Sequence, residues 1–164
     1  MAIAALVGFT AAPLAASAIW SPPVLLVWNA SASAPVGLYR VHDGGPIGRG
    51  DMVVAWTPEP VRSLAARRRY LPRNVPLVKR VAAAAGDEVC AIGRTVFVNG
   101  RPAALRSRRD PSGRLMPWWS GCRALGRGEL FLLNPSVPQA FDGRYFGVTS
   151  ADRLLGTARL LWRR

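Results

Sequence analysis

Short apolar runs separated by glycine, proline and asparagine positions fill the chain from residue 29 onward. Alternation of apolar and polar positions with a period of two is typical of half-buried strands, and clusters of turn residues mark their ends. The pattern predicts strands over residues 37–41, 52–56, 77–82, 88–92, 95–98, 130–133 and 157–162. Asn99-Gly100 predicts a hairpin turn, and residues 61–70 are the best helix candidate. We therefore expect a mainly β fold.

Residues 1–27 have a different pattern, because they are mostly apolar and carry no charged side chain. About 20 apolar residues suffice to span a bilayer, and membrane helices tolerate proline. We therefore expect one N-terminal transmembrane helix, with residues 1–28 as the anchor and residues 29–164 as a β-rich domain. Two other interpretations stay open: a buried core helix, or a signal peptide cleaved after Ala16-Ser17-Ala18.

The chain has 164 residues, which suits one domain, and 50% of them are hydrophobic, which argues against disorder. The formal net charge of +13 favours an acidic partner, either nucleic acid or an anionic membrane surface. Arginine clusters lie at residues 67–69 and 106–109. We interpret them as solvated surface, with membrane lipid as the alternative partner. Nucleic acid is not expected, because no aromatic residues are interleaved there for base stacking.

Lys79 is the single lysine among 22 Lys and Arg residues. Arginine is never deprotonated in proteins, so a lysine kept in such an arginine-rich chain is a candidate for a role that needs a neutral amine. On a strand, Lys79 shares one face with Leu77 and Val81. Burial among such neighbours lowers the pKa of a lysine, and reaching about 7 to 8 takes about 4 kcal/mol.

Several familiar chemistries do not fit the sequence. The one histidine, His42, lies in a polar turn, and no phosphate-binding G-x-x-x-x-G-K-[ST] motif occurs. Cys90 and Cys122 are too few for an ordinary zinc site, and two cysteines in an exported domain favour one disulfide. We therefore expect neither a metal nor a cofactor. A serine activated by lysine remains, and Ser33 lies in a loop of small residues directly after the apolar stretch.

Four blocks, in order along the chain, resemble the type I signal peptidases. They are Ser31-Ala32-Ser33-Ala34-Pro35, Arg49-Gly50-Asp51-Met52-Val53-Val54, Val78-Lys79-Arg80-Val81 with Gly86-Asp87, and Phe141-Asp142-Gly143-Arg144-Tyr145-Phe146-Gly147. Further strings are similar to the TraF-like branch, the signal peptidases of conjugative transfer: Pro35-Val36-Gly37-Leu38-Tyr39, Tyr70-Leu71-Pro72, Trp119-Ser120-Gly121-Cys122 and Phe131-Leu132-Leu133-Asn134. Four ordered blocks are far more specific than any one of them.

The resemblance implies roles for residues. Ser33 corresponds to the nucleophile and Lys79 to the general base. The backbone N–H of Ser33 and the hydroxyl of Ser31 correspond to the oxyanion hole. Asp142 and Arg144 match a structural ion pair near the site, and we add Arg80, the neighbour of Lys79, as further structural support. The family fold is an all-β catalytic core held at the membrane by N-terminal helices.

The resemblance also implies a substrate, which is an exported precursor with small residues before the cut, here a conjugative pilin or transfer protein. The enzyme would lie in the inner membrane with its catalytic domain on the periplasmic side. The last block departs from the family's S-x-D-S-R string, because Ala140 and Gly143 replace both serines. This departure motivates an alternative, a catalytically impaired scaffold of a conjugative secretion apparatus. The net charge motivates a third hypothesis, a nucleic-acid-binding protein of a transfer system.

Overall fold

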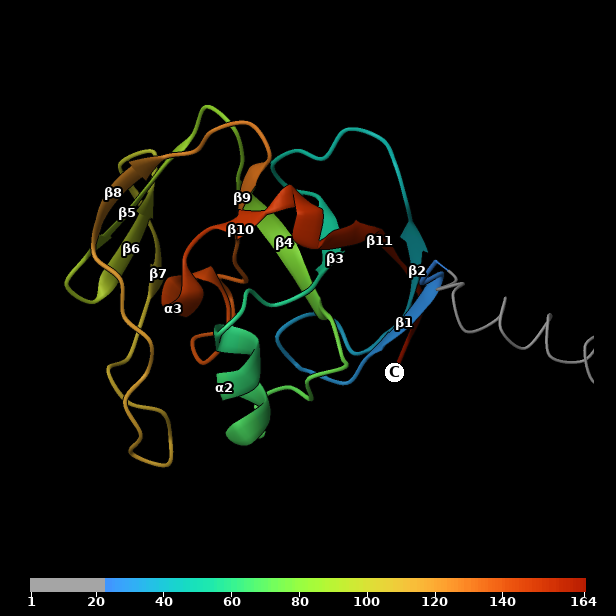
Figure 1. Cartoon of the computed structure of the whole chain (residues 1–164), viewed down its shortest axis with the longest axis horizontal. Helices are drawn as coiled ribbons and strands as arrows, with labels where there is room; N and C mark the ends of the chain where they lie inside the picture. The colour runs from blue at the N-terminus through green and yellow to red at the C-terminus, as the bar shows by residue number, and fades with distance from the viewer. Residues whose placement is uncertain (1–22) are drawn as a thin grey trace, which may run out of the picture.

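The computed structural model describes residues 23–164, which form two antiparallel sheets (Figure 1). The strands are β1 (Leu26–Asn29), β2 (Gly37–His42), β3 (Met52–Ala55), β4 (Leu77–Ala83), β5 (Glu88–Ile92), β6 (Thr95–Val98), β7 (Arg101–Leu105), β8 (Gly121–Ala124), β9 (Glu129–Leu132), β10 (Thr149–Ser150) and β11 (Leu154–Arg163). The helices are α2 (Val61–Arg67), α3 (Gly143–Phe146) and the 3-10 helix η1 (Ala151–Arg153). The prediction of a mainly β fold is confirmed.

Most of the predicted transmembrane anchor, residues 1–22 of the range 1–28, lies outside the described residues. Within residues 23–164, no helix combines the length and hydropathy that a bilayer span needs. Strand β1 begins at Leu26, so the β-rich domain starts before residue 29, where the sequence pattern put its boundary. The apolar run Leu26–Asn29 folds as a strand because it pairs with β2 and buries every second side chain, Val27 and Asn29.

The larger sheet has seven strands in the order β1-β2-β11-β3-β4-β9-β10. Its last strand in the sequence, β11, therefore lies between β2 and β3 and pairs with both. Strand β4 pairs with β3 on one side and β9 on the other, so it is an inner strand with a neighbour along each edge. Lys79 is the third residue of this strand, and it is buried.

The smaller sheet has four strands in the order β7-β6-β5-β8, and it lies at the left of Figure 1. The predicted hairpin is confirmed, since Asn99 and Gly100 connect β6 to β7 with φ values of 49° and 73°. The inner side of this sheet packs on β9, and the shared core consists of Ala83, Val89, Ala91, Val96, Val98, Leu125, Phe131 and Leu133. This core fixes the end of β9 next to β4.

Candidate active site

The loop that carries Ser33 connects β1 to β2 and is held by the buried side chain of Asn29. Its amide nitrogen donates to the carbonyls of Ser31 at 2.9 Å, Ala34 at 3.1 Å and Pro35 at 3.0 Å. The hydroxyl of Tyr39 donates to the same Pro35 carbonyl at 2.8 Å. A loop of small residues with this many hydrogen bonds presents Ser33 in one conformation, half-buried at the edge of the domain.

Lys79 reaches this serine from β4. Its Nζ lies 2.5 Å from Ser33 Oγ and donates a hydrogen bond to it. The side chain is only 1% exposed, so the sequence-based prediction of a buried lysine is confirmed. The strand and the loop, 46 residues apart in the sequence, thus bring a hydroxyl and an amine into direct contact.

Burial lowers the pKa of Lys79 to about 8. The carboxylate of Asp142 raises this pKa and the guanidinium of Arg144 lowers it, so the two neighbouring charges oppose each other. Desolvation is therefore the dominant cause of the shift. With a pKa of about 8, a substantial fraction of the amine is neutral near physiological pH and is able to accept a proton.

Ser31 lies beside the same hydroxyl. Its Oγ is 2.8 Å from Ser33 Oγ and accepts a hydrogen bond of 3.3 Å from the backbone N–H of Ser33. The two groups predicted for the oxyanion hole are therefore adjacent, with the Ser33 N–H donating to the oxygen of the Ser31 hydroxyl. A bound oxyanion would accept from both groups in place of this hydrogen bond.

Asn134 connects the two halves of the site, a role that was not predicted from the sequence. Its side-chain amide donates to the Ser33 carbonyl, and its side-chain oxygen accepts from the backbone N–H of Arg80 at 3.1 Å. The first bond holds the serine loop, and the second holds the strand residue next to Lys79. The only signal in the sequence was its place in the string Phe131-Leu132-Leu133-Asn134, which marked the position without a function.

The predicted ion pair between Asp142 and Arg144 is present and fully buried. Arg144 Nε donates to Asp142 Oδ1 at 2.8 Å and Nη2 to Oδ2 at 3.1 Å, which makes the pair bidentate. Its remaining donors reach the carbonyls of Asn134 at 2.9 Å, Pro138 at 2.8 Å and Leu105 at 3.2 Å. Asp142 also accepts from the Asn134 N–H at 3.0 Å, so the pair fixes the backbone of Asn134.

Arg80, the third predicted supporting residue, is exposed. Its guanidinium donates to the Gly50 carbonyl at 2.6 Å, which fastens β4 to the turn before β3. Arg80 supports the neighbouring Lys79 through its backbone N–H, which donates a hydrogen bond to the side-chain oxygen of Asn134.

Two grooves meet at the serine loop, and both are lined by Ala32, Ser33 and Val137. The larger has a volume of about 760 Å³ and extends to Tyr70 and Phe141. The smaller, of about 450 Å³, extends to Met52 and Arg80. An extended peptide crossing Ser33 would occupy one groove on each side of the bond it presents to the hydroxyl.

The sequence profile of the family described as signal peptidase, peptidase S26, matches residues 1–163. The chain belongs to this signal peptidase family. The resemblance inferred from the sequence blocks is confirmed.

The chain is similar to two plasmid transfer proteins TraF from Escherichia coli. One is 35% identical over 146 residues, covering 82% of each chain, and the other is 33% identical over 136 residues, covering 77% of this chain and 76% of the relative. A probable conjugal transfer protein TraF from Sinorhizobium fredii is 33% identical over 141 residues, covering 80% and 73%. A crystallised signal peptidase I from Enterococcus faecalis V583 aligns with 18% identity, a TM-score of 0.40 and coverage of 69% and 97%.

The last of the four sequence blocks has a structural reason for lacking one serine. A Cβ atom at Gly143 would lie 2.8 Å from the carbonyl oxygen of Leu132 and 2.9 Å from the Phe131 ring. Packing of α3 against β9 therefore leaves no room for a side chain at this position. Ala140 is buried beside the larger groove, where it contributes only a methyl group.

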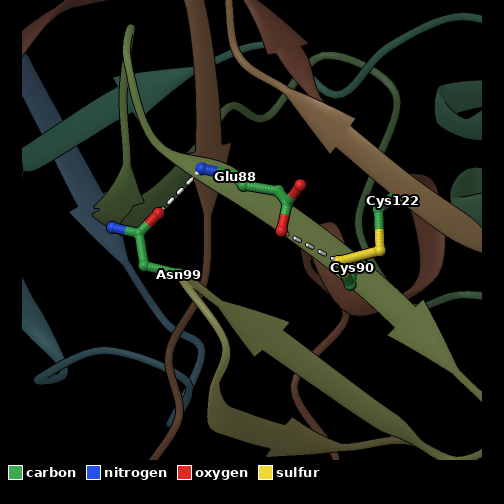
Figure 2. The surroundings of a disulfide bond; sticks show 4 residues. All are labelled: Glu88, Cys90, Asn99 and Cys122. Carbon is green, nitrogen blue, oxygen red and sulfur yellow. Dashed lines mark hydrogen bonds between the residues drawn. A yellow bond between two sulfur atoms is a disulfide. The ribbon is translucent and has the colours of Figure 1, made fainter.

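The predicted disulfide is confirmed, because the Sγ atoms of Cys90 on β5 and Cys122 on β8 are bonded at a distance of 2.08 Å (Figure 2). The carboxylate of Glu88 lies 3.5 Å from Cys90 Sγ, and its backbone N–H donates to Asn99 Oδ1 at 2.8 Å. The bond ties β8 to the smaller sheet, although β8 buries none of its own side chains.

Proposed function

We propose that this protein is a membrane-anchored serine endopeptidase of the signal-peptidase type, with Ser33 as nucleophile and Lys79 as general base. The observation that carries the proposal is the 2.5 Å contact between Lys79 Nζ and Ser33 Oγ, made by an amine that burial keeps partly neutral. A nucleophile and a base at hydrogen-bond distance, with the base held in place, are the two requirements for serine activation.

In the first step, Ser33 Oγ attacks the carbonyl carbon of the scissile peptide bond while its proton passes to the neutral Nζ of Lys79. The negative charge that forms on the carbonyl oxygen accepts hydrogen bonds from the Ser33 N–H and the Ser31 hydroxyl. One such donor lowers the barrier by about 3 kcal/mol. The Ser31 hydroxyl has to turn away from the Ser33 N–H, which it contacts at 3.3 Å when no peptide is bound.

The tetrahedral intermediate then collapses. The Lys79 ammonium returns its proton to the leaving nitrogen, so the C–N bond breaks, a free amine departs and an ester to Ser33 remains. Water then attacks this ester while it gives a proton to the neutral Lys79. In the second collapse the Lys79 ammonium returns this proton to Ser33 Oγ, so the ester bond breaks, a carboxylic acid is released and the Ser33 hydroxyl is restored.

The substrate class follows from family membership and from the relatives. Signal peptidases of this type cut exported precursors after small residues, and the groove next to Ser33 is lined by Ala32 and Ala140. The TraF relatives are named as plasmid or conjugal transfer proteins. We therefore assign a precursor of a conjugative pilin or transfer protein as substrate, bound as an extended strand.

Membrane attachment is supported by an exposed apolar surface on β1 and β11. Trp28 and Trp162 lie with ring centroids 5.6 Å apart and are 44% and 58% exposed. Leu26, which lies on the same face of β1 as Trp28 and is 56% exposed, extends this surface. Tryptophan favours the membrane–water interface, and β1 follows the apolar N-terminal segment that we propose as the anchor. The disulfide supports a periplasmic catalytic domain, because such bonds persist in oxidising compartments.

A second candidate is a catalytically impaired scaffold of a conjugative secretion apparatus. The observation that favours it is the absence of both family serines, at Ala140 and Gly143, since these residues offer Lys79 no hydroxyl.

One experiment separates the two candidates. The full chain is expressed in membranes with a conjugative pilin precursor, and processing is followed by the size of the product. The wild type is expected to shorten the precursor, while Ser33→Ala and Lys79→Arg leave it uncut. Arg127→Lys, a change at an exposed residue outside the site, is the control and should cut normally. Processing by Lys79→Arg would refute the dyad. An uncut precursor with intact conjugative transfer in both wild type and Lys79→Arg would favour the scaffold.

A further inference from the structure

The larger groove is bounded in part by a hairpin-like segment, residues 107–116, that is fastened to the end of α2. An isolated bridge joins Arg109 to Leu115 within this segment. The guanidinium of Arg68 donates to the Leu115 carbonyl at 2.7 Å. The hydroxyl of Tyr70 also donates to the carboxylate of Asp110. These contacts hold the segment in place beside the groove that contains Ser33.

The groove is electropositive. Arg68, Arg109 and Arg114 line it, and among the described residues Asp110 is the single carboxylate in its lining. Asp110 is already occupied, because it accepts from the Tyr70 hydroxyl, from the Arg114 N–H at 2.8 Å and from Arg114 Nε at 2.7 Å. Its side chain is 3% exposed, so it holds Arg114 in position and offers little negative charge to an incoming ligand.

All three guanidinium groups keep unused donors, and two of them, Arg109 and Arg114, belong to the hairpin-like segment. Arg114 uses Nε for Asp110, which leaves both of its terminal nitrogens. Arg109 uses Nη1 for the Gly113 carbonyl at 2.5 Å, which leaves Nε and Nη2. A guanidinium presents donors in a planar fork that fits a carboxylate with two parallel hydrogen bonds.

We propose that Arg109 and Arg114 form a specificity site for an acidic side chain of the precursor, at a fixed number of residues from the cut. The proposal rests on the proposed function, because the groove is a substrate site only if Ser33 is the nucleophile. A peptide extended over Ser33 runs along the groove, so its small residues lie against Ala32 and Ala140 and one aspartate or glutamate reaches the hairpin.

The test uses the full chain in detergent and a library of synthetic peptides. Each peptide has small residues around a central cut, with glutamate, glutamine or lysine placed at each other position in turn. Mass spectrometry of the products gives the relative cleavage rates. The wild type is expected to prefer glutamate over glutamine at one position by about fivefold, the effect of one exposed ion pair.

Variants decide whether the arginines cause the preference. Arg109→Gln and Arg114→Gln are expected to abolish it, whereas Arg127→Gln, the same change at an exposed arginine outside the groove, keeps it. Arg109→Glu should reverse it toward lysine, a gain that a misfolded variant does not show. Cleavage by the wild type without an acidic preference overturns this proposal alone. No cleavage of any peptide overturns the proposed function and this proposal together.

Discussion

The amine of Lys79 and the hydroxyl of Ser33 are 2.5 Å apart, and the lysine that makes this contact is 1% exposed. The contact and the burial concern the same amine. Lys79 is close enough to Ser33 to take its proton, and burial destabilises the protonated form of Lys79. The chemistry of this site therefore has to depend on pH in the range where Lys79 titrates.

We expect kcat/KM to rise about tenfold per pH unit below pH 8 and to level off above it, because only neutral Lys79 accepts the serine proton. Initial rates on a cleavable peptide between about pH 6 and pH 10 measure this profile. A rate that stays constant through pH 8 would contradict the assignment of Lys79 as base.

The buried lysine also lowers the stability of the fold at neutral pH. Its folded-state pKa of about 8 lies below the ordinary value of 10.5, so between these values the unfolded chain binds more protons. Stability from this group therefore rises with pH through that window, and the cost at pH 7 is about 3 kcal/mol. Lys79→Met should be more stable than the wild type at pH 7 by up to this amount, and the difference should shrink toward pH 10.5.

Urea unfolding of both proteins at several pH values measures this difference. Lys79→Arg is the matched control, because its charge persists at every pH and it should be less stable than the wild type throughout. A Met variant that is less stable at pH 7 would show that the lysine is not desolvated.

Asn134 should affect the rate of the chemical step rather than peptide binding, because it fixes Ser33 against the strand of Lys79. Asn134→Asp keeps the shape and removes the donor to the Ser33 carbonyl. We expect kcat to fall on the order of 100-fold, the cost of a small misplacement of reacting groups, with KM unchanged. Asn74→Asp, the same change at an exposed residue, should leave both constants as they are. A rise in KM alone would mean that Asn134 contacts the substrate instead.

Gly143 is expected to tolerate no side chain. Gly143→Ala should lower the free energy of unfolding by about 1–3 kcal/mol, because the added methyl clashes with the Leu132 carbonyl and the Phe131 ring. Gly48→Ala is the control, since a Cβ there would meet no atom within 4 Å. Thermal melts compare the two variants, and equal melting temperatures would contradict the packing argument.

The disulfide closes a loop with a sequence separation of 32 residues. Loop-closure entropy predicts that Cys90→Ser with Cys122→Ser costs about 3–4 kcal/mol of stability. Urea titrations with and without reductant measure this loss. The wild type should weaken in reductant, whereas the double variant should not respond. Stability that reductant leaves unchanged in the wild type would refute the contribution of the bond.

The predicted strands share a local signal, which is a short apolar run bounded by turn residues in the sequence. The strands that were not predicted lack it for identifiable reasons. Strand β8 exposes all of its side chains. Strand β7 begins with Arg101-Pro102, and because proline has no backbone N–H to donate, it fits only on an edge strand such as β7. Strand β1 continues an apolar run, so its alternation of burial appears only when it pairs with β2.

The site was predictable where its residues have intrinsic chemistry. A single lysine on an apolar strand face predicted the buried amine of Lys79, whereas the family resemblance was needed to select Ser33 in its loop of small residues. Asn134 was not, because its role depends on partners far away in the sequence, with Ser33 lying 101 residues earlier. An asparagine has no distinctive chemistry of its own, and only the folded arrangement reveals its two hydrogen bonds.

Strand β11 has a central place in the larger sheet although it carries no residue of the candidate site. Strand β2, which follows the Ser33 loop, and strand β3, which neighbours Lys79 on β4, are joined edge to edge only through β11. The position of the serine relative to the lysine within this sheet therefore depends on a segment, residues 154–163, that lies more than 70 residues beyond Lys79 in the sequence.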